Sequence, residues 1–384
     1  MNLNNVKMIS NNEPVNLRIN EGKIAEISSS ALSDTTNSLS LKFNNAIIFP
    51  GLINSHDHLD FNLFPQFGNQ FYSNYTEWGK YIHEHYQDEI ARTIAIPVEL
   101  RSRWGVFKNL VCGVTTVVNH GEPSGLDSDL ITIFEKHQCI HSVQLEKRWR
   151  FKLNNPFKSG LPVVTHVGEG DDWPSFREID RLISWNLLNK KLIGVHGVMM
   201  SDTQAANFEA LVWCPQSNYF LLNKTASVNL LKDYTNILFG TDSTLTGSWD
   251  IWAHLRTARK TALLSDETLF ETFNQKPAKT WGLNSGAIES GKDADLVVAK
   301  AKKNGSDFDT FYGITPEDLL LVIHKGNIRL FDETLSGQLN LHDFDSFSRV
   351  YINGAGKYVQ GDLPALMKEI KKYNPSVVFP VNIN

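Results

Sequence analysis

The sequence has few cysteines, no large excess of charge of either sign and no long apolar run. Its three cysteines, Cys112, Cys139 and Cys214, show no close CxxC spacing, which argues against a disulfide framework and against a thiolate zinc site. The 37 basic and 42 acidic side chains give a formal charge of −5, so the chain carries no electrostatic footprint for nucleic acid or an anionic membrane. A small-molecule partner is therefore expected.

Membrane-spanning and targeting signals are also missing from the pattern. No apolar run approaches the ~20 residues that cross a bilayer. The first residues, MNLNNVKMIS, lack the basic start and apolar core of a signal peptide. We expect a soluble cytoplasmic protein without membrane contact, and 384 residues suffice for one large domain with a smaller appendage. The sequence leaves a homo-oligomer open.

The chain changes its pattern three times. Residues 1–49 alternate short apolar stretches with Asn, Gly and Ser turns, which is typical of antiparallel strands. Residues 50–284 alternate short apolar runs with longer amphipathic segments, the βα pattern of a parallel sheet. Residues 285–331 again predict short strands, which could rejoin the first segment. Residues 332–384 form an extension in which DLPALMKEIKKYNP predicts a helix that packs on the core.

Seven strands can be identified in the βα region, at residues 51–56, 113–120, 140–145, 161–166, 192–196, 210–214 and 236–242. This pattern favours an α/β fold, a TIM-like (β/α)₈ barrel, which needs eight strands. The interval between Leu145 and Val164 is too short for a full βα unit of roughly 30 residues. We therefore expect one shortened or missing unit there.

Residues able to bind a metal follow the ends of these strands. His56 and His58, in FPGLINSHDHLDF, share one face of a strand because side chains at i and i+2 point the same way. Further candidates end later strands: His166 in VVTHVGEG, His196 in IGVHGVMM and Asp242 in ILFGTDST. A single histidine there is more often a core or cap residue. Five such residues at the carboxyl ends of parallel strands predict one shared site.

These motifs resemble the amidohydrolase superfamily, especially its metal-dependent deaminase and chlorohydrolase-like branch, which includes cytosine and guanine deaminases. The resemblance rests on PGLINSHDH, GVTTVVNHG, THVGEG, VHGVMMSD, CPQSN, GTDS and SGAIESGKDADLVV, and covers residues 1 to about 331. It implies that one divalent metal is held by His56, His58, His166 and Asp242, with His196 close to the bound water. It also implies that the N- and C-terminal segments form a composite β-sandwich beside the barrel.

The residue types agree with these roles. Three imidazoles and one carboxylate suit Zn²⁺, with Fe²⁺ as the alternative metal. Asp242 could accept a proton from the metal-bound water, and His196 could stabilise the developing oxyanion. Glu169, in HxxE, could pass a proton to a ring nitrogen and then to a leaving amine. The alternative is a solvated loop acid or an N-cap partner for DDWPSFREI.

The expected activity is hydrolysis of a carbon–nitrogen bond: metal-bound hydroxide deaminates an amino-substituted heterocycle or an amidine. Hydrolysis of a cyclic amide, or displacement of another leaving group, would use the same mononuclear site and stays open. A noncatalytic metalloprotein is a third interpretation, against which Glu169 and His196 count, because a structural metal requires neither. Fold and metal do not name the substrate.

Several other polar residues are candidates for a role in the site. Asn119, His120, Trp173 and Asn218 are predicted to contact the substrate, because they follow strand ends or lie in the adjoining loops. His83 and His85 form a second HxH, but their helical setting points them about 200° apart and excludes joint chelation. Lys147 is an alternative metal-bridging residue, since binuclear members of the family use a carbamylated lysine on a middle strand.

Overall fold

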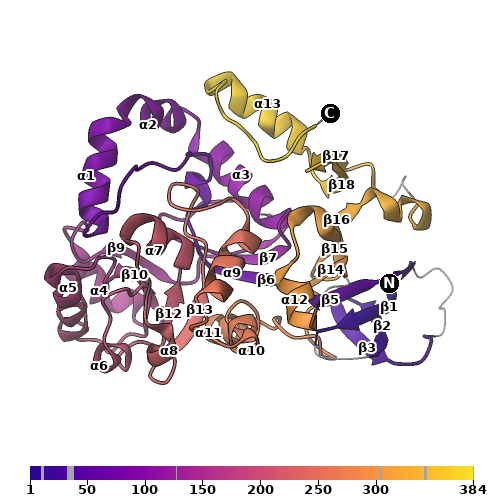
Figure 1. Ribbon diagram of the computed structural model, residues 1–384, viewed down its shortest axis with the longest axis horizontal. Helices are drawn as coiled ribbons and strands as arrows, with labels where there is room; N and C mark the ends of the chain where they lie inside the picture. Colours follow the sequence, from indigo (N-terminus) through magenta and orange to yellow (C-terminus); the bar gives the residue numbers. More distant parts are fainter. Residues whose placement is uncertain (10–12, 33–38, 127, 303–304, 341–343, 384) are drawn as a thin grey trace.

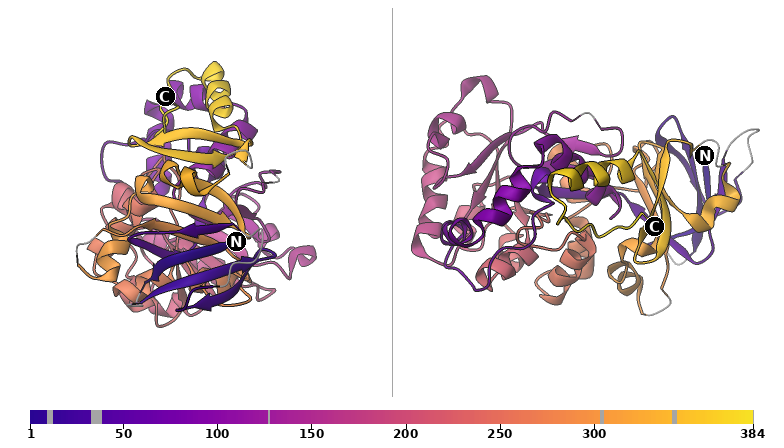
Figure 2. Two further views of the ribbon diagram at one scale, coloured as in Figure 1. Left: turned by 90° about the vertical axis from the view of Figure 1, so that its right-hand side faces the viewer. Right: turned by 90° about the horizontal axis from the view of Figure 1, so that it is seen from above.

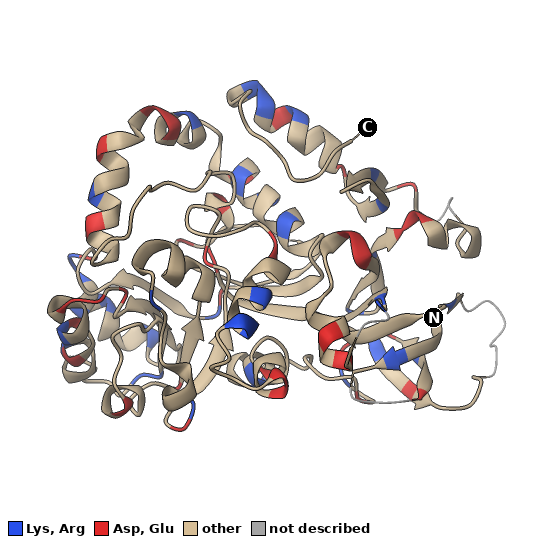
Figure 3. Cartoon of the chain, in the orientation of Figure 1, with Lys and Arg blue, Asp and Glu red and all other residues tan. Residues whose placement is uncertain are grey.

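The computed structural model describes residues 1–9, 13–32, 39–126, 128–302, 305–340 and 344–383. It has two parts, a β-rich part that contains the N-terminus and an α/β part of parallel strands wrapped by helices (Figures 1 and 2). Basic and acidic residues are interspersed over both parts (Figure 3). None of the helices within the described residues has the length and apolar character needed to cross a membrane.

The β-rich part joins both ends of the chain. Its strands are β1 (Asn2–Met8), β2 (Pro14–Asn20), β3 (Lys23–Ser28), β4 (Ser40–Lys42), β5 (Ala46–Pro50), β14 (Leu296–Lys300), β15 (Leu319–His324), β16 (Asn327–Asp332), β17 (Phe347–Ile352) and β18 (Ala355–Gln360). The order is β17-β18-β16-β15-β14-β5-β1-β2-β3, with β4 paired to β1. The antiparallel pair β5–β14 connects the N- and C-terminal segments. The sequence predicted a sandwich, whereas hydrogen bonds link these strands into one ten-stranded sheet.

The α/β part contains β6 (Leu52–Asp57), β7 (Val114–Asn119), β8 (Thr132–Phe134), β9 (Gln138–Ser142), β10 (Val163–Val167), β11 (Leu192–His196), β12 (Ala210–Trp213) and β13 (Asn236–Phe239). They form two parallel sheets, β6-β7-β8 and β13-β12-β11-β10-β9. Within the described residues no strand ladder joins β8 to β9, and β13 meets β6 only at an isolated bridge between Asp57 and Asp242. The fold is therefore of the TIM-barrel type, but the expected closed ring of strand ladders is not found.

The shortened unit lies elsewhere than predicted. The interval between Leu145 and Val164 holds α4 (Trp149–Leu153) and η2 (Pro156–Lys158). The missing helix is instead between β8 and β9, where residues 135–137 alone connect the two strands. The sequence pattern did not separate β8 from β9, because the three residues of β8 are half-buried and the run TIFEKHQCI continues from β8 into β9.

The remaining helices surround the parallel strands and fill the connections. They are η1 (Leu59–Phe61), α1 (Tyr75–His85), α2 (Gln87–Ile94), α3 (Val98–Leu110), α5 (Trp173–Ser184), α6 (Asp202–Ala205), α7 (Pro215–Leu222), α8 (Val228–Leu231), α9 (Ile251–Lys260), α10 (Asp266–Glu271), α11 (Gln275–Trp281), α12 (Asp307–Tyr312), η3 (Pro316–Asp318), η4 (Glu333–Gln338) and α13 (Leu363–Tyr373). Helix α13 begins at the Asp362 cap, ends before Pro375 and packs on α3.

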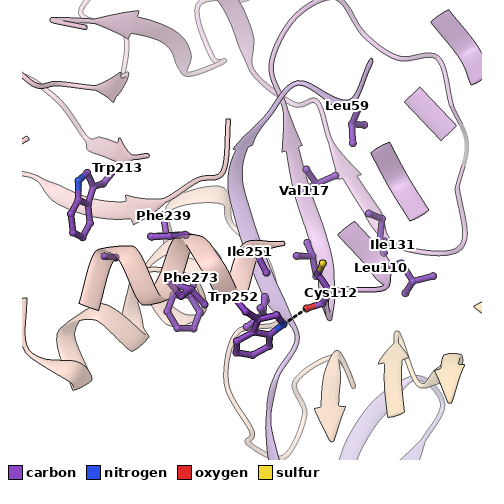
Figure 4. Packing of buried hydrophobic residues seen from close by; sticks show 14 of the residues in the cluster. Leu59, Leu110, Cys112, Val117, Ile131, Trp213, Phe239, Ile251, Trp252 and Phe273 are labelled. Carbon is purple, nitrogen blue, oxygen red and sulfur yellow. Dashed lines mark hydrogen bonds between the residues drawn. The ribbon is translucent and has the colours of Figure 1, made fainter. Parts of the chain in front are cut away.

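One hydrophobic core runs through both parts. The cluster that includes Val117 and Phe239 of the parallel strands also includes Val297 and Val359 of the ten-stranded sheet. Trp252 of α9 lies at its centre, where the indole N–H donates to the carbonyl oxygen of Cys112 at 3.0 Å (Figure 4). Each large apolar side chain buried in this way contributes about 1.5–3 kcal/mol, so the core provides a rigid base for the strand ends above it.

Candidate metal-dependent active site

The predicted site residues meet at the carboxyl ends of the parallel strands. His56 and His58 lie at the end of β6, His166 within β10, His196 at the end of β11 and Asp242 just after β13. All five are buried, with exposed fractions between 0% and 7%. The two sheets therefore contribute to one cluster: His56 and His58 come from the three-stranded sheet, and the other three residues come from the five-stranded sheet.

The donor atoms of this cluster face one another. Nε2 of His56 lies 3.2 Å from Nε2 of His166. The Nε2 atoms of His56 and His58 each lie 3.5 Å from Oδ1 of Asp242. Two overlapping groups have all their donor atoms within 4.8 Å of one another, one of His56, His120 and His166 and one of His56, His196 and Asp242.

This donor set fits a divalent metal. Imidazole nitrogens and a carboxylate oxygen are the ligands that Zn²⁺ prefers in sites without cysteine. Burial lowers the pKa of His166 well below its usual value and, with His56 nearby, lowers the pKa of His58 to about 4. Both rings are therefore neutral at neutral pH, the form in which a histidine binds a metal.

Asp242 is fixed by its neighbours. Burial acts to raise the pKa of its carboxyl, but the contact with His56 and the nearby His196 and His58 hold that pKa well below its usual range. Its Oδ2 accepts hydrogen bonds from the hydroxyls of Ser217 and Thr246, each at 2.8 Å. Oδ1 is thus the atom left to face the histidines.

The backbone is strained at two of these positions. Asp242 has a φ of 62° and His196 a φ of 71°, in the left-handed region that residues other than glycine rarely adopt. Such conformations persist only where the surrounding structure enforces them, and they gather at functional sites.

His196 and Glu169 form a second pair beside the metal-binding group. Nε2 of His196 lies 3.5 Å from Oε1 of Glu169, and Nδ1 lies 2.9 Å from the side-chain amide nitrogen of Asn218. If that amide donates to Nδ1, the neutral imidazole carries its proton on Nε2. Burial lowers the pKa of His196 to about 3. Burial, together with Asp242 and Glu178, raises the pKa of Glu169 well above its usual value.

The loop that carries Glu169 is held between two helices. The backbone N–H of Tyr75, at the start of α1, donates to the carbonyl oxygen of Glu169 at 3.1 Å. Glu178 of α5 accepts the N–H of Gly168 at 2.7 Å. A Cβ added to Gly170 would lie 2.2 Å from the hydroxyl of Ser175, so only glycine permits this approach. Glu169 is consequently placed with little freedom.

The predicted substrate-binding residues lie at different distances from the cluster. His120 is buried, its ring stacks on that of His166 with centroids 4.4 Å apart, and neither of its nitrogens has a hydrogen-bond partner. Asn218 is buried and contacts His196, as above. Asn119 points to Glu135, whose Oε1 accepts its amide at 3.0 Å. Trp173 is 62% exposed and stacks on Phe176 at the surface.

Three further predictions can be located. His83 and His85 are exposed on α1, and Lys147 is exposed in the loop after β9. None of them belongs to the donor groups found among the described residues.

Sequence reasoning missed His141 and the two hydroxyls that hold Asp242. His141 of β9 is exposed, and its ring centroid lies 5.1 Å from that of His166, so it lies at the edge of the cluster. The predicted strand 140–145 placed His141 at its amino end, whereas β9 ends at Ser142 and brings His141 to the carboxyl end. Ser217 and Thr246 gave no signal, because a hydroxyl at a loop position has many ordinary roles.

Residues 158–329 match the model of the amidohydrolase family. The predicted resemblance to that superfamily is confirmed. Two curated relatives, 5-methylthioadenosine/S-adenosylhomocysteine deaminases of Pyrococcus abyssi and Pyrococcus furiosus, are each 29% identical, over 33% and 46% of this chain. The alignments span 33% and 47% of those relatives, less than half their length.

Solved structures share the fold. A zinc complex of atrazine chlorohydrolase from Arthrobacter aurescens has a TM-score of 0.68 at 15% identity, covering 85% of this chain and 94% of its own. A zinc-bound adenosine deaminase from Xanthomonas campestris also has a TM-score of 0.68 at 15% identity, and 98% of each chain is covered. This likeness extends over both the parallel strands and the β-rich part.

Proposed function

We propose that this protein is a metal-dependent hydrolase that deaminates an amino-substituted heterocycle. The observation that carries the proposal is the buried Glu169–His196 pair, which lies beside the facing donor atoms of His56, His166 and Asp242. A site that only binds a metal has no use for a buried carboxyl whose pKa is raised, whereas a reaction that expels ammonia needs a proton donor.

The four metal-binding positions are His56, His58, His166 and Asp242, and the donor chemistry favours one Zn²⁺. A divalent ion held there supplies Lewis acidity, which lowers the pKa of water toward 7. Residues 50–284 contain every residue of this site, and we assign the β-rich segments 1–49 and 285–331, with the extension 332–384, to its support.

Three side chains around the proposed metal position have different roles in the reaction. Oδ1 of Asp242 is ionised and faces the histidines, so it can accept a proton from the attacking water. The N–H at Nε2 of His196 can donate a hydrogen bond to the oxygen that adds to the substrate carbon, because its ring is neutral and fixed by Asn218. Glu169, whose pKa burial raises well above its usual value, can carry a proton to a ring nitrogen and later to the amine.

The aminopurine nucleosides are the first substrate class to test. The Pyrococcus relatives are named for deaminating 5-methylthioadenosine and S-adenosylhomocysteine. Because the alignments cover less than half of those proteins, this substrate class is part of the proposal.

The test is ammonia release from zinc-loaded protein. Aminopurine nucleosides, aminopyrimidines, pterins and lactams are incubated with the enzyme, and ammonia and products are quantified. We expect stoichiometric ammonia and the corresponding oxo product from one amino heterocycle. Ring opening of a lactam without ammonia would contradict deamination and would assign a cyclic amidase.

A further inference from the structure

The residue between the two metal-binding histidines has a role of its own. Asp57 points away from His56 and His58 and is fully buried. Its Oδ2 accepts hydrogen bonds from Nζ of Lys108 at 2.8 Å and from the amide of Asn109 at 2.8 Å. Lys108 is itself only 2% exposed, so a charged pair lies in the interior directly behind the site.

Helix α3 brings Lys108 to this position. Gly105 packs so closely on the segment after His58 that a Cβ there would lie 2.3 Å from the carbonyl oxygen of Leu59. On the same face, the indole of Trp104 donates to the carbonyl oxygen of Asn62 at 2.9 Å. Asn62 in turn donates to Oδ1 of Asp57 at 2.6 Å and accepts from Lys108 at 3.2 Å. The buried face of α3 is therefore built to hold this segment.

The same network reaches the strand that carries Asp242. Asn54 of β6 donates to Oδ2 of Asp57 at 3.0 Å and to the hydroxyl of Thr241 at 2.8 Å. Its own Oδ1 accepts the backbone N–H of Thr241 at 3.1 Å. The backbone N–H groups of Thr241 and Asp242 both donate to the carbonyl oxygen of His56 at 3.0 Å.

This connection joins the two halves of the site. His56 and His58 belong to the three-stranded sheet, whereas His166 and Asp242 belong to the five-stranded sheet. Across the described residues, β8 and β9 do not pair, and the only bridge between the two sheets is Asp57–Asp242. Side-chain hydrogen bonds around Asp57 thus connect β6 to β13, where a strand ladder would otherwise hold two neighbouring strands together.

We propose that the buried Lys108–Asp57 ion pair positions the two halves of the metal site relative to each other. Lys108 and Asp57 are positioning residues, since neither faces the donor cluster. This inference rests on the proposed metal site and adds that the ion pair aligns the two halves of that site. Removing Lys108 would leave the Asp57 carboxylate buried without its countercharge, and β6 would shift to hydrate it.

The test compares zinc affinity in matched lysine variants. Lys108→Met should weaken zinc binding about 10- to 100-fold, the usual effect of losing a group that orients a ligand. Lys357→Met is the control, because Lys357 is fully buried and pairs with Asp332 at 2.6 Å in the ten-stranded sheet. It should lower stability without changing zinc affinity. Affinity is measured by competition with a chromophoric chelator, below the unfolding temperature of each variant.

A second variant covers the case in which Lys108→Met does not fold. The double variant Asp57→Asn/Lys108→Met removes both charges, so the net charge near the site is unchanged, and the amide oxygen can keep the hydrogen bonds that Oδ2 accepts from Asn54 and Asn109. It should fold, bind zinc at least about 10-fold more weakly than the wild type, and show an altered visible spectrum with Co²⁺.

Three results would overturn the proposal. Wild-type zinc affinity and Co²⁺ spectrum in folded Lys108→Met, or in the double variant, would show that the pair aligns nothing. An equal loss of affinity in Lys357→Met would show a general effect of stability. Failure of the wild-type protein to bind zinc would remove the proposed function as well, so the two failures are distinguishable.

Discussion

Nε2 of His56 lies 3.2 Å from Nε2 of His166, although 110 residues separate them in the chain. At this distance two imidazole nitrogens need a proton or a cation between them, because their lone pairs repel each other. Asp242 lies 3.5 Å from His56 on another side, so nitrogen and oxygen donors surround one position. The relationship between His56 and His166 is the structural basis for a metal at this point.

The protein should bind about one divalent metal per chain. His56→Ala should lower zinc occupancy sharply without unfolding the chain, since this histidine lies at the rim of the strands and the apolar core lies beneath. Elemental analysis after dialysis measures the metal content per chain of the wild type and of the variant. His83→Ala is the control, because His83 belongs to the exposed HxH of α1 and should bind no metal. Two metals per chain with a modified Lys147 would contradict the mononuclear site.

Glu169→Gln should reduce turnover by about 10² to 10⁴-fold while leaving zinc occupancy and substrate affinity nearly unchanged. The amide keeps the size of the side chain but cannot carry a proton to the leaving amine. Steady-state rates and zinc content measure the two effects, once the ammonia screen has supplied a substrate.

Asp171→Asn is the matched control for Glu169. Asp171 lies two residues further along the same loop, is exposed and pairs with Lys224 at 2.7 Å. Its variant should retain the wild-type rate. Equal rates in both variants would make Glu169 an ordinary loop acid, and loss of zinc from Glu169→Gln would make it a support of the metal ligands.

The main site residues could be predicted from the sequence because each of them follows a strand with a clear apolar pattern. HDH after β6 and GTDS after β13 lie at chain positions where the fold class places functional groups. The alternation of side chains along a strand also places Asp57 on the face opposite to its two neighbours. What it turns toward could not be predicted, because Lys108 lies on a helix 51 residues later and its buried amine contradicts the usual exposure of lysine.

The shortened βα unit was placed incorrectly for a related reason. A three-residue strand such as β8 is too short to show the alternation of buried and exposed side chains, so β8 was not predicted as a strand. The shortened unit was therefore assigned to the interval from Leu145 to Val164. His120 shows the limit for single residues. Its position in VVNHG predicts a histidine at a strand end. Its stacking on His166 and its unpartnered nitrogens depend on the distance between β7 and β10, which the sequence does not give.

Glu178 should make the stability of the protein depend on pH. Burial raises the pKa of its carboxyl from 4.5 to about 7, although the Gly168 N–H that it accepts acts in the opposite direction. Between these two pH values the folded state keeps a proton that the unfolded state has released. The free energy of unfolding therefore falls as pH rises through this window, and the contribution is complete below 4.5 and lost above about 7.

Glu178→Gln should remove that dependence, because the amide does not ionise and can still accept the Gly168 N–H. Relative to the wild type, the variant should differ little at pH 5 and be more stable by roughly 3 kcal/mol at pH 8, from about 1.4 kcal/mol per pKa unit over the shift from 4.5 to about 7. Urea unfolding at both pH values measures the difference. Glu84→Gln on the exposed face of α1 should show no such trend. A variant that tracks the wild type at both pH values would mean that Glu178 is ionised in the folded protein throughout, with its charge compensated by neighbouring donors.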